Sequence, residues 1–105
     1  MMNERVKRYF ENPRKIKAIE PMKGYKLLIT FDNGELKKYD MTNDLTGVSS
    51  VLKDETKFNS VFLNDIGNVA WNIDENIDSS VQWDNQIDLC KDMLYMESVP
   101  VQTEE

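Results

Sequence analysis

The pattern of apolar and polar residues changes its period near the start of the chain. The first eleven residues place four apolar side chains at helical spacing, and Asn12-Pro13 then ends the run. These apolar residues are Met2, Val6, Tyr9 and Phe10. From Lys15 onward, apolar and polar residues alternate. The pattern therefore predicts a short amphipathic helix followed by strands.

Residues 15–39 predict three antiparallel strands that follow one another as a meander. Asp32-Asn33-Gly34 carries the strongest local signal, because Asn and Gly accept the positive φ of a tight hairpin turn. Residues 21–24 form the expected turn between the first two strands. One face of the first strand is expected to carry Ile16, Ala18 and Glu20, and one face of the second Tyr25, Leu27, Ile29 and Phe31.

The second half of the chain predicts one helix followed by further short strands. Extended runs at residues 60–63 and 69–73 flank a turn at residues 64–67, which predicts a second hairpin. The expected helical face carries Val48, Val51, Leu52, Glu55 and Phe58, with Ser49 or Ser50 as the amino-terminal cap. The chain then offers short strands at residues 81–83 and 87–89 and one or two helical turns at residues 91–96.

This order of elements predicts a small α+β domain, in which one helix covers one face of a mostly antiparallel sheet. A length of 105 residues and a hydrophobic content of 40% fit one domain with one core. We expect an amino-terminal helical extension at residues 1–12, a single domain at residues 13–96 and a flexible acidic tail at residues 97–105. The expected core residues are Leu27, Ile29, Phe31, Leu52, Phe58 and Val61.

Two groups of short motifs, near the two ends of this domain, occur together in the chain. The first group is Pro13-Arg14-Lys15-Ile16, Ile19-Glu20-Pro21, Tyr25-Lys26-Leu27-Leu28, Phe31-Asp32-Asn33-Gly34-Glu35 and Tyr39-Asp40. The second group is Trp83-Asp84-Asn85, Ile87-Asp88-Leu89, Asp92 and Leu94-Tyr95. With Leu52, Phe58 and Val61 between them, these motifs resemble the bacterial family known as domain of unknown function 2442.

The resemblance covers residues 13–95 and leaves residues 1–12 outside. Residues 74–80 are an insertion relative to the shortest form of the family pattern, and Lys91 stands where many members have proline. The resemblance implies a small bacterial or mobile-element protein, often encoded beside another small protein in a pairing that suggests toxin and antitoxin. It supplies no catalytic residues.

Charge is distributed unevenly along the chain, whose net charge is -6. Residues 1–52 carry ten basic and seven acidic side chains, for +3, whereas residues 53–105 carry three basic and twelve acidic, for -9. An acidic surface repels phosphates and attracts basic proteins, so it favours a protein partner over direct nucleic-acid binding. A solvated surface with no partner explains the same charge.

The remaining composition bears on location. The apolar runs are only a few residues long, and the amino terminus is charged from Glu4 onward, so we expect neither a membrane span nor a signal peptide. Cys90 is the only cysteine and cannot form an intrachain disulfide. The composition therefore favours the cytoplasm.

Few residues are suited to catalysis. The chain has no histidine, which is the commonest general base and nitrogen metal ligand. Cys90 is interpreted as a buried, inert thiol. The aspartates do not match a calcium loop, and the four glycines are too far apart for a phosphate loop. We therefore expect no enzyme activity, no metal and no cofactor.

The leading functional hypothesis is that the protein binds a basic protein partner encoded nearby, in an antitoxin-like or accessory role. The sequence is also compatible with a homo-oligomer. The expected contact residues are Trp71, Asp74, Asp78, Trp83, Asp84, Asp88 and Tyr95, because large aromatics flanked by charge can anchor and orient a partner. An alternative places both tryptophans in the core. A second hypothesis is an acidic, phage-type inhibitor that mimics nucleic acid, using Asp74, Glu75, Asp78, Asp84 and Asp88. A third is nucleic-acid binding through Arg5, Lys7, Arg8, Arg14, Lys15 and Lys17.

Overall fold

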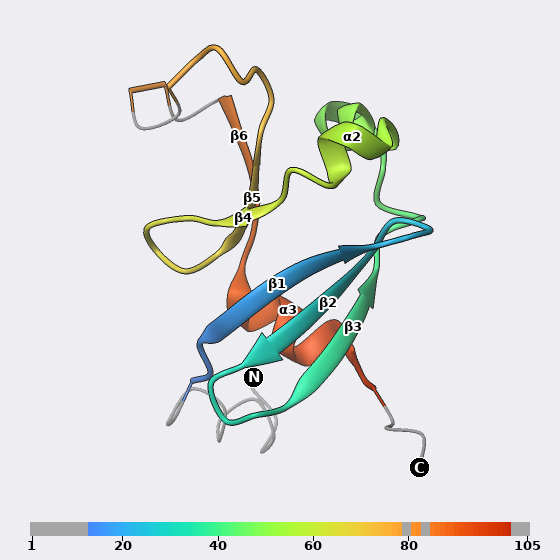
Figure 1. Ribbon diagram of the computed structural model, residues 1–105, viewed down its shortest axis with the longest axis vertical. Helices are drawn as coiled ribbons and strands as arrows, with labels where there is room; N and C mark the ends of the chain where they lie inside the picture. The colour runs from blue at the N-terminus through green and yellow to red at the C-terminus, as the bar shows by residue number, and fades with distance from the viewer. Residues whose placement is uncertain (1–12, 79–80, 83–84, 102–105) are drawn as a thin grey trace, which may run out of the picture.

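The computed structural model describes residues 13–78, 81–82 and 85–101 and contains two small antiparallel sheets (Figure 1). The four-stranded sheet, in the order β1-β2-β3-β7, consists of β1 (Ile16–Met22), β2 (Lys26–Phe31), β3 (Leu36–Asp40) and β7 (Val99–Pro100). The three-stranded sheet, in the order β4-β5-β6, consists of β4 (Phe62–Leu63), β5 (Val69–Asn72) and β6 (Gln86–Leu89). The helical elements are a 3-10 helix η1 (Gly47–Lys53) and the α-helices α2 (Glu55–Phe58) and α3 (Lys91–Glu97). The predicted α+β class is confirmed.

The predicted meander is confirmed, and its inward face forms the centre of the core. Leu27, Ile29 and Phe31 alternate along β2 and are fully buried. Gly34 has a φ of +89°, as the hairpin turn requires. Tyr25 differs from the prediction, because it lies in the β1–β2 turn with a positive φ of 61° instead of opening β2. Its ring still contacts the core, edge-on to Phe58 with centroids 5.5 Å apart.

The prediction that Ile16, Ala18 and Glu20 share one face of β1 is wrong after Ile16. The register with β2 shifts between Ile16 and Ala18, which marks an irregularity in the strand. Such a shift reverses the alternation, so that Ile19 packs against the core with Ile16, while Ala18 and Glu20 are exposed.

The predicted middle helix is replaced by two shorter elements. Leu52 in η1 and Phe58 in α2 are buried as expected, but Val48 is 65% exposed. The expected serine caps are also wrong, because Asp54 caps α2 by accepting a hydrogen bond from Thr56 N at 2.9 Å. This segment lies beyond one end of the four-stranded sheet, and the helix behind β1–β3 is α3 (Figure 1).

The boundary of the expected carboxyl-terminal tail is also corrected. Val99 and Pro100 pair with Lys38 and Lys37 as β7, and Val101 N donates to Leu36 O at 2.9 Å. These backbone hydrogen bonds hold residues 99–101 in the fold. Residues 102–105 and the predicted helix at residues 1–12 lie outside the described residues.

The two sheets share one hydrophobic cluster. Phe58 and Trp71 lie at the junction, with ring centroids 5.9 Å apart, and Trp71 Nε1 donates to Phe58 O at 2.9 Å. Val61 packs against the cluster from its edge. The cluster covers the inward face of the three-stranded sheet. The outward face of that sheet is turned away from the core.

Candidate protein-binding groove

A groove of about 590 Å³ crosses the outward face of the three-stranded sheet. We call it the acidic groove. It is lined by Phe62, Leu63, Asn64, Asp65, Ile66, Asn72, Glu75, Ile77, Asp78 and Gln86.

The alternation of β5 and β6 determines which side chains reach the groove. Asn72 lies opposite Gln86 in the register, and both line the groove. Trp71 and Ile87 also lie opposite each other, and both are buried on the inward face. Asn64 Nδ2 donates to Gln86 Oε1 at 2.9 Å. This hydrogen bond ties the β4–β5 turn to the floor of the groove.

The β4–β5 turn forms the first wall of the groove. Asn64 Oδ1 accepts hydrogen bonds from Ile66 N at 3.2 Å and from Asn68 N at 2.9 Å, and Gly67 supplies the positive φ of 82°. The turn therefore holds Asp65 and Ile66 outward, and Ile66 is 70% exposed.

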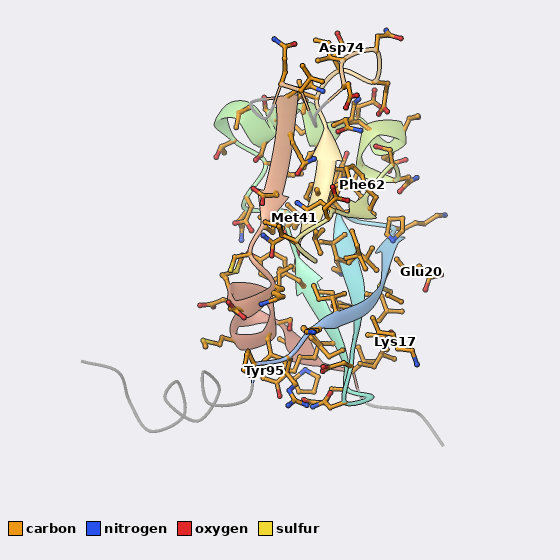
Figure 2. The ribbon with its side chains drawn as sticks, turned by 90° about the vertical axis from the view of Figure 1, so that its left-hand side faces the viewer. Lys17, Glu20, Met41, Phe62, Asp74 and Tyr95 are labelled. Carbon is orange, nitrogen blue, oxygen red and sulfur yellow. The ribbon has the colours of Figure 1, made fainter. Side chains whose placement is uncertain are left out.

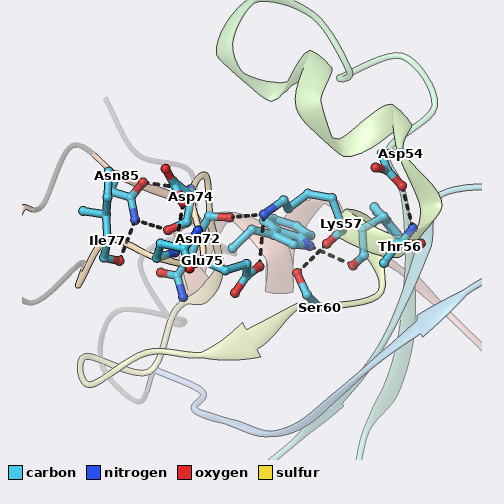
Figure 3. A network of polar contacts seen from close by, with 12 residues as sticks. Asp54, Thr56, Lys57, Ser60, Asn72, Asp74, Glu75, Ile77 and Asn85 are labelled. Atoms are coloured by element: carbon cyan, nitrogen blue, oxygen red, sulfur yellow. Dashed lines mark hydrogen bonds and ion pairs between the residues drawn. The ribbon is translucent and has the colours of Figure 1, made fainter.

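The segment after β5 forms the second wall (Figure 3). Asn85, which is buried, accepts from Asp74 N at 2.9 Å and donates to Asp74 O at 3.0 Å and to Ile77 O at 3.1 Å. Through these three hydrogen bonds to backbone atoms, the Asn85 side chain fixes residues 74–77 as a turn. Ile77 remains 37% exposed.

Charge in the acidic groove is of one sign. Its lining includes three carboxylates, those of Asp65, Glu75 and Asp78, and no basic side chain. Lys57 reaches Glu75 from beside the groove, with Nζ 3.0 Å from both Glu75 Oε1 and Asn72 O (Figure 3). Such a surface attracts cationic groups, while Phe62 and the two isoleucines offer apolar contact.

The structure brings together some of the predicted acidic residues. Asp78 lines the groove, and Asp74 belongs to the turn of its second wall, where its Oδ1 accepts from Asn76 N at 2.9 Å. Asp88 is exposed on β6, and its Oδ2 accepts from Asn68 Nδ2 at 3.3 Å. Trp83 and Asp84 lie outside the described residues.

The two described aromatic residues predicted to contact a partner do not belong to this groove. Trp71 is 0% exposed and donates its indole hydrogen bond within the core, so its assignment as a contact residue is corrected. Tyr95, on α3, lies at the opposite end of the molecule from Asp74 (Figure 2). Its ring packs edge-on against Phe31 with centroids 4.9 Å apart.

Tyr95 belongs to a polar cluster between α3 and the β2–β3 hairpin. Its hydroxyl donates to Glu35, and this hydrogen bond lowers the pKa of Glu35 and raises the pKa of Tyr95. Lys37 Nζ lies 3.8 Å from the centre of the Tyr95 ring and donates to Tyr95 O at 2.7 Å. These contacts connect α3 to the β2–β3 hairpin, so the polar groups of this cluster are used within the fold.

The basic residues expected for nucleic-acid binding are only partly described. Lys15 and Lys17 are exposed, whereas Arg14 is half-buried with Nη1 3.7 Å from Asp32 Oδ1. Arg5, Lys7 and Arg8 lie outside the described residues. Of the six expected basic residues, the structure therefore places three, and nucleic-acid binding through them stays a prediction.

Cys90 corrects another expectation, because its side chain is exposed where a buried thiol was predicted. Its Sγ lies 3.8 Å from Asp92 Oδ2, at the start of α3. Among residues 13–78, 81–82 and 85–101, no group of three or more cysteine, aspartate and glutamate side chains is placed to hold a metal ion. No helix in the described part is long and apolar enough to cross a membrane.

Apart from Glu75 and Asp78, the residues that line the groove were not among the candidate contact residues. Asp65, Ile66 and Ile77 are the ones that add charge or exposed apolar surface. Isoleucine is unusual in a turn, where Gly, Asn, Asp and Ser prevail. Asp65-Ile66 and Ile77-Asp78 each place an isoleucine beside an aspartate within a turn, which was the available signal.

Comparison with known proteins adds no relative. No family model, no curated protein and no solved structure matches this chain significantly.

Proposed function

We propose that the protein is a non-enzymatic binding module that holds a basic protein partner against the acidic groove. The observation that carries the proposal is the three carboxylates and two exposed isoleucines gathered around one groove with no basic lining residue. Complementary charge speeds encounter and orients the partner, and apolar contact then slows dissociation.

The setting that fits this proposal is a bacterial or mobile-element system in the cytoplasm. The resemblance to domain of unknown function 2442 supports an antitoxin-like or accessory role, with the partner encoded by an adjacent gene. The uneven charge of the chain supports a basic partner.

An inhibitor that mimics nucleic acid is the second candidate, favoured by Asp65, Glu75 and Asp78 sharing one groove. It would occupy the basic groove of a nuclease or effector through charge alone. Ile66 and Ile77 are exposed among these carboxylates, and mimicry of phosphates does not require apolar side chains. The two candidates therefore differ in whether apolar contact contributes to affinity.

Co-purification with the product of the adjacent gene tests the proposed function. Asp65→Lys should weaken the complex, because Asp65 lines the groove. Glu20→Lys is the matched control, since Glu20 is exposed on β1, outside the groove, and undergoes the same charge change. No complex with the wild-type chain, or equal losses in the two variants, would overturn the proposal.

A further inference from the structure

Four strands form the outer edges of the two sheets, and three of them are protected against pairing with a further strand. β1 carries a register shift between Ile16 and Ala18, and Pro21 in the same strand has no N–H to donate. β4 and β7 each contain only two residues. β6 differs, because its four residues contain no proline and pair with β5 in an unbroken register. β6 is therefore the edge best suited to receive another strand.

The backbone of β6 directs the hydrogen-bonding groups of two residues towards its open edge. Ile73 N donates to Asn85 O at 2.7 Å, and these residues lie opposite each other, so they form a hydrogen-bonded pair of the antiparallel ladder. Hydrogen-bonded and non-hydrogen-bonded pairs alternate along such a ladder, which makes the pairs at Gln86 and at Asp88 non-hydrogen-bonded. The N–H and C=O groups of Gln86 and Asp88 therefore point away from β5, and the described residues place no strand on that side.

The side chains of β6 define the kind of strand that fits beside it. Asp88 is exposed on the outward face, where its Oδ2 accepts from the neutral amide of Asn68 at 3.3 Å. The ion pairs found in the described part of the chain do not include Asp88. Ile87 and Leu89 face inward and contact the hydrophobic cluster. Because side chains alternate in an added strand too, a basic residue beside Asp88 and apolar residues beside Ile87 would complement this edge.

We propose that an extended segment of the partner protein, with alternating basic and apolar residues, adds to the edge of β6 as a further strand. Its backbone pairs with Gln86 and Asp88, one basic side chain lies against Asp88, and its apolar side chains extend the inward face beyond Ile87. This inference rests on the proposed function and specifies how the partner binds. The added strand lies next to the acidic groove, because Gln86 belongs both to β6 and to the lining of the groove.

Amide hydrogen exchange of the full chain, followed residue by residue with NMR, tests the pairing directly. In the free chain, Gln86 and Asp88 should exchange quickly and Ile87 slowly, because of these three only the Ile87 N–H faces β5. The probe is the capped peptide Gly-Thr-Val-Lys-Val-Thr-Gly. At saturation it should slow the exchange of Gln86 and Asp88 at least tenfold, and unchanged exchange at both residues would overturn the inference.

Two modified peptides separate backbone pairing from attraction by charge. N-methylation of the lysine and of both threonines keeps the side chains and the charge but removes the N–H groups that would face β6. This peptide should bind at least tenfold more weakly, because hydrogen bonds of the ladder are lost. Replacing Lys by Gln should weaken binding only about two- to fivefold, because an exposed ion pair contributes little. Equal binding of the parent and N-methylated peptides would overturn the inference and leave recognition by charge.

Asp88→Pro and Asp88→Asn are a matched pair of variants at this edge. Both remove the carboxylate, but only proline removes the N–H, and an edge strand tolerates proline where its nitrogen faces solvent. Asp88→Asn should weaken the parent peptide about two- to fivefold, and Asp88→Pro at least tenfold. Equal losses would count against strand addition. Circular dichroism checks that Asp88→Pro folds, and the N-methylated peptide makes the same test on the wild-type chain.

The adjacent gene product separates this inference from the proposed function. A complex in which Gln86 and Asp88 keep their fast exchange would overturn the inference alone, whereas the absence of any complex would overturn both. Slowed exchange that appears in the chain alone as its concentration rises would identify a second copy of the chain as the occupant, and would overturn the assignment to a partner.

Discussion

The two sheets use their charged side chains in opposite ways. At the four-stranded sheet, Lys37 is 5% exposed and its Nζ contacts Tyr95, whose hydroxyl in turn binds Glu35. At the three-stranded sheet, Asp65 and Asp78 instead line an open groove. Charge in the first region therefore connects α3 to the β2–β3 hairpin, whereas Asp65 stands on an exposed turn that lines the groove. We expect binding at this exposed acidic surface.

The largest expected effect tests whether these regions share one core. Trp71→Ala should lower the free energy of unfolding by about 3–5 kcal/mol, because it leaves a cavity beside Phe58. Leu27→Ala, in the other sheet, should cost about 2–5 kcal/mol. Chemical denaturation followed by fluorescence and by circular dichroism should give one shared transition for both variants. Two separate transitions would mean that the sheets unfold independently.

Lys37→Met tests whether charge in the four-stranded sheet stabilises the fold. The variant keeps an unbranched side chain but removes the donor to Tyr95 O, and a buried acceptor left unpaired costs roughly 1–3 kcal/mol. Lys38→Met is the control, because Lys38 is exposed on the same strand. Urea denaturation should show the loss only for Lys37→Met. Equal stability of the two variants would contradict the assigned role.

Gly34→Val separates backbone strain from packing. Gly34 has a φ of +89°, and no atom lies within 4 Å of the position that a Cβ would occupy. The expected loss of about 1–2 kcal/mol therefore comes from the left-handed backbone alone. Gly34→Asn should recover much of it, because asparagine tolerates this conformation better. Equal losses for Val and Asn in thermal denaturation would argue against backbone strain.

The smallest effect is a dependence on pH at the Glu35–Tyr95 hydrogen bond. The fold lowers the pKa of Glu35 from its ordinary value of 4.5. The ionised Glu35 therefore contributes to the free energy of unfolding above pH 4.5, and this contribution is lost as the pH falls through the folded pKa. The fold raises the pKa of Tyr95 from 10.0. The protonated Tyr95 therefore contributes to the free energy of unfolding below pH 10, and this contribution is lost as the pH rises through the folded pKa. Tyr95→Phe should reduce both losses in denaturation experiments at several pH values. An unchanged acid loss in Tyr95→Phe would contradict this role of the hydrogen bond.

Tyrosine ionisation offers an independent check at high pH. Burial and then the hydrogen bond to Asp44, at 2.7 Å, raise the pKa of Tyr39 to about 12. Titration monitored by ultraviolet absorbance should therefore contain one tyrosine that ionises near pH 12, and Tyr39→Phe should remove it. A complete titration well below that pH would contradict the environment assigned to Tyr39.

The sequence predicted the parts of the fold that depend on neighbouring residues. The meander followed from the alternation of Leu27, Ile29 and Phe31 and from the turn at Asn33-Gly34, which act over a few residues. The buried position of Lys37 was not predictable, because its partner Tyr95 lies 58 residues away. The strand β7 was missed for a similar reason, since two residues gain strand structure only by pairing with β3.

The candidate site was predicted only in part. Asp74 and Asp78 were selected for their charge, and Trp71 for its size, but size equally suits a core residue. Asn85 organises the second wall through contacts with Asp74 and Ile77, which no sequence spacing indicates. Tertiary contacts therefore determined which acidic residues gather around one groove.

The most direct test of the central claim is the rate of association with the adjacent gene product, measured at increasing salt. If the acidic groove receives a basic partner, salt should slow association of the wild-type chain, and Asp65→Lys should slow it further and flatten the salt dependence. Glu20→Lys should leave the wild-type dependence almost unchanged. Equal slowing by Asp65→Lys and Glu20→Lys would show that overall charge acts instead, and would contradict the assignment of the groove as the binding surface.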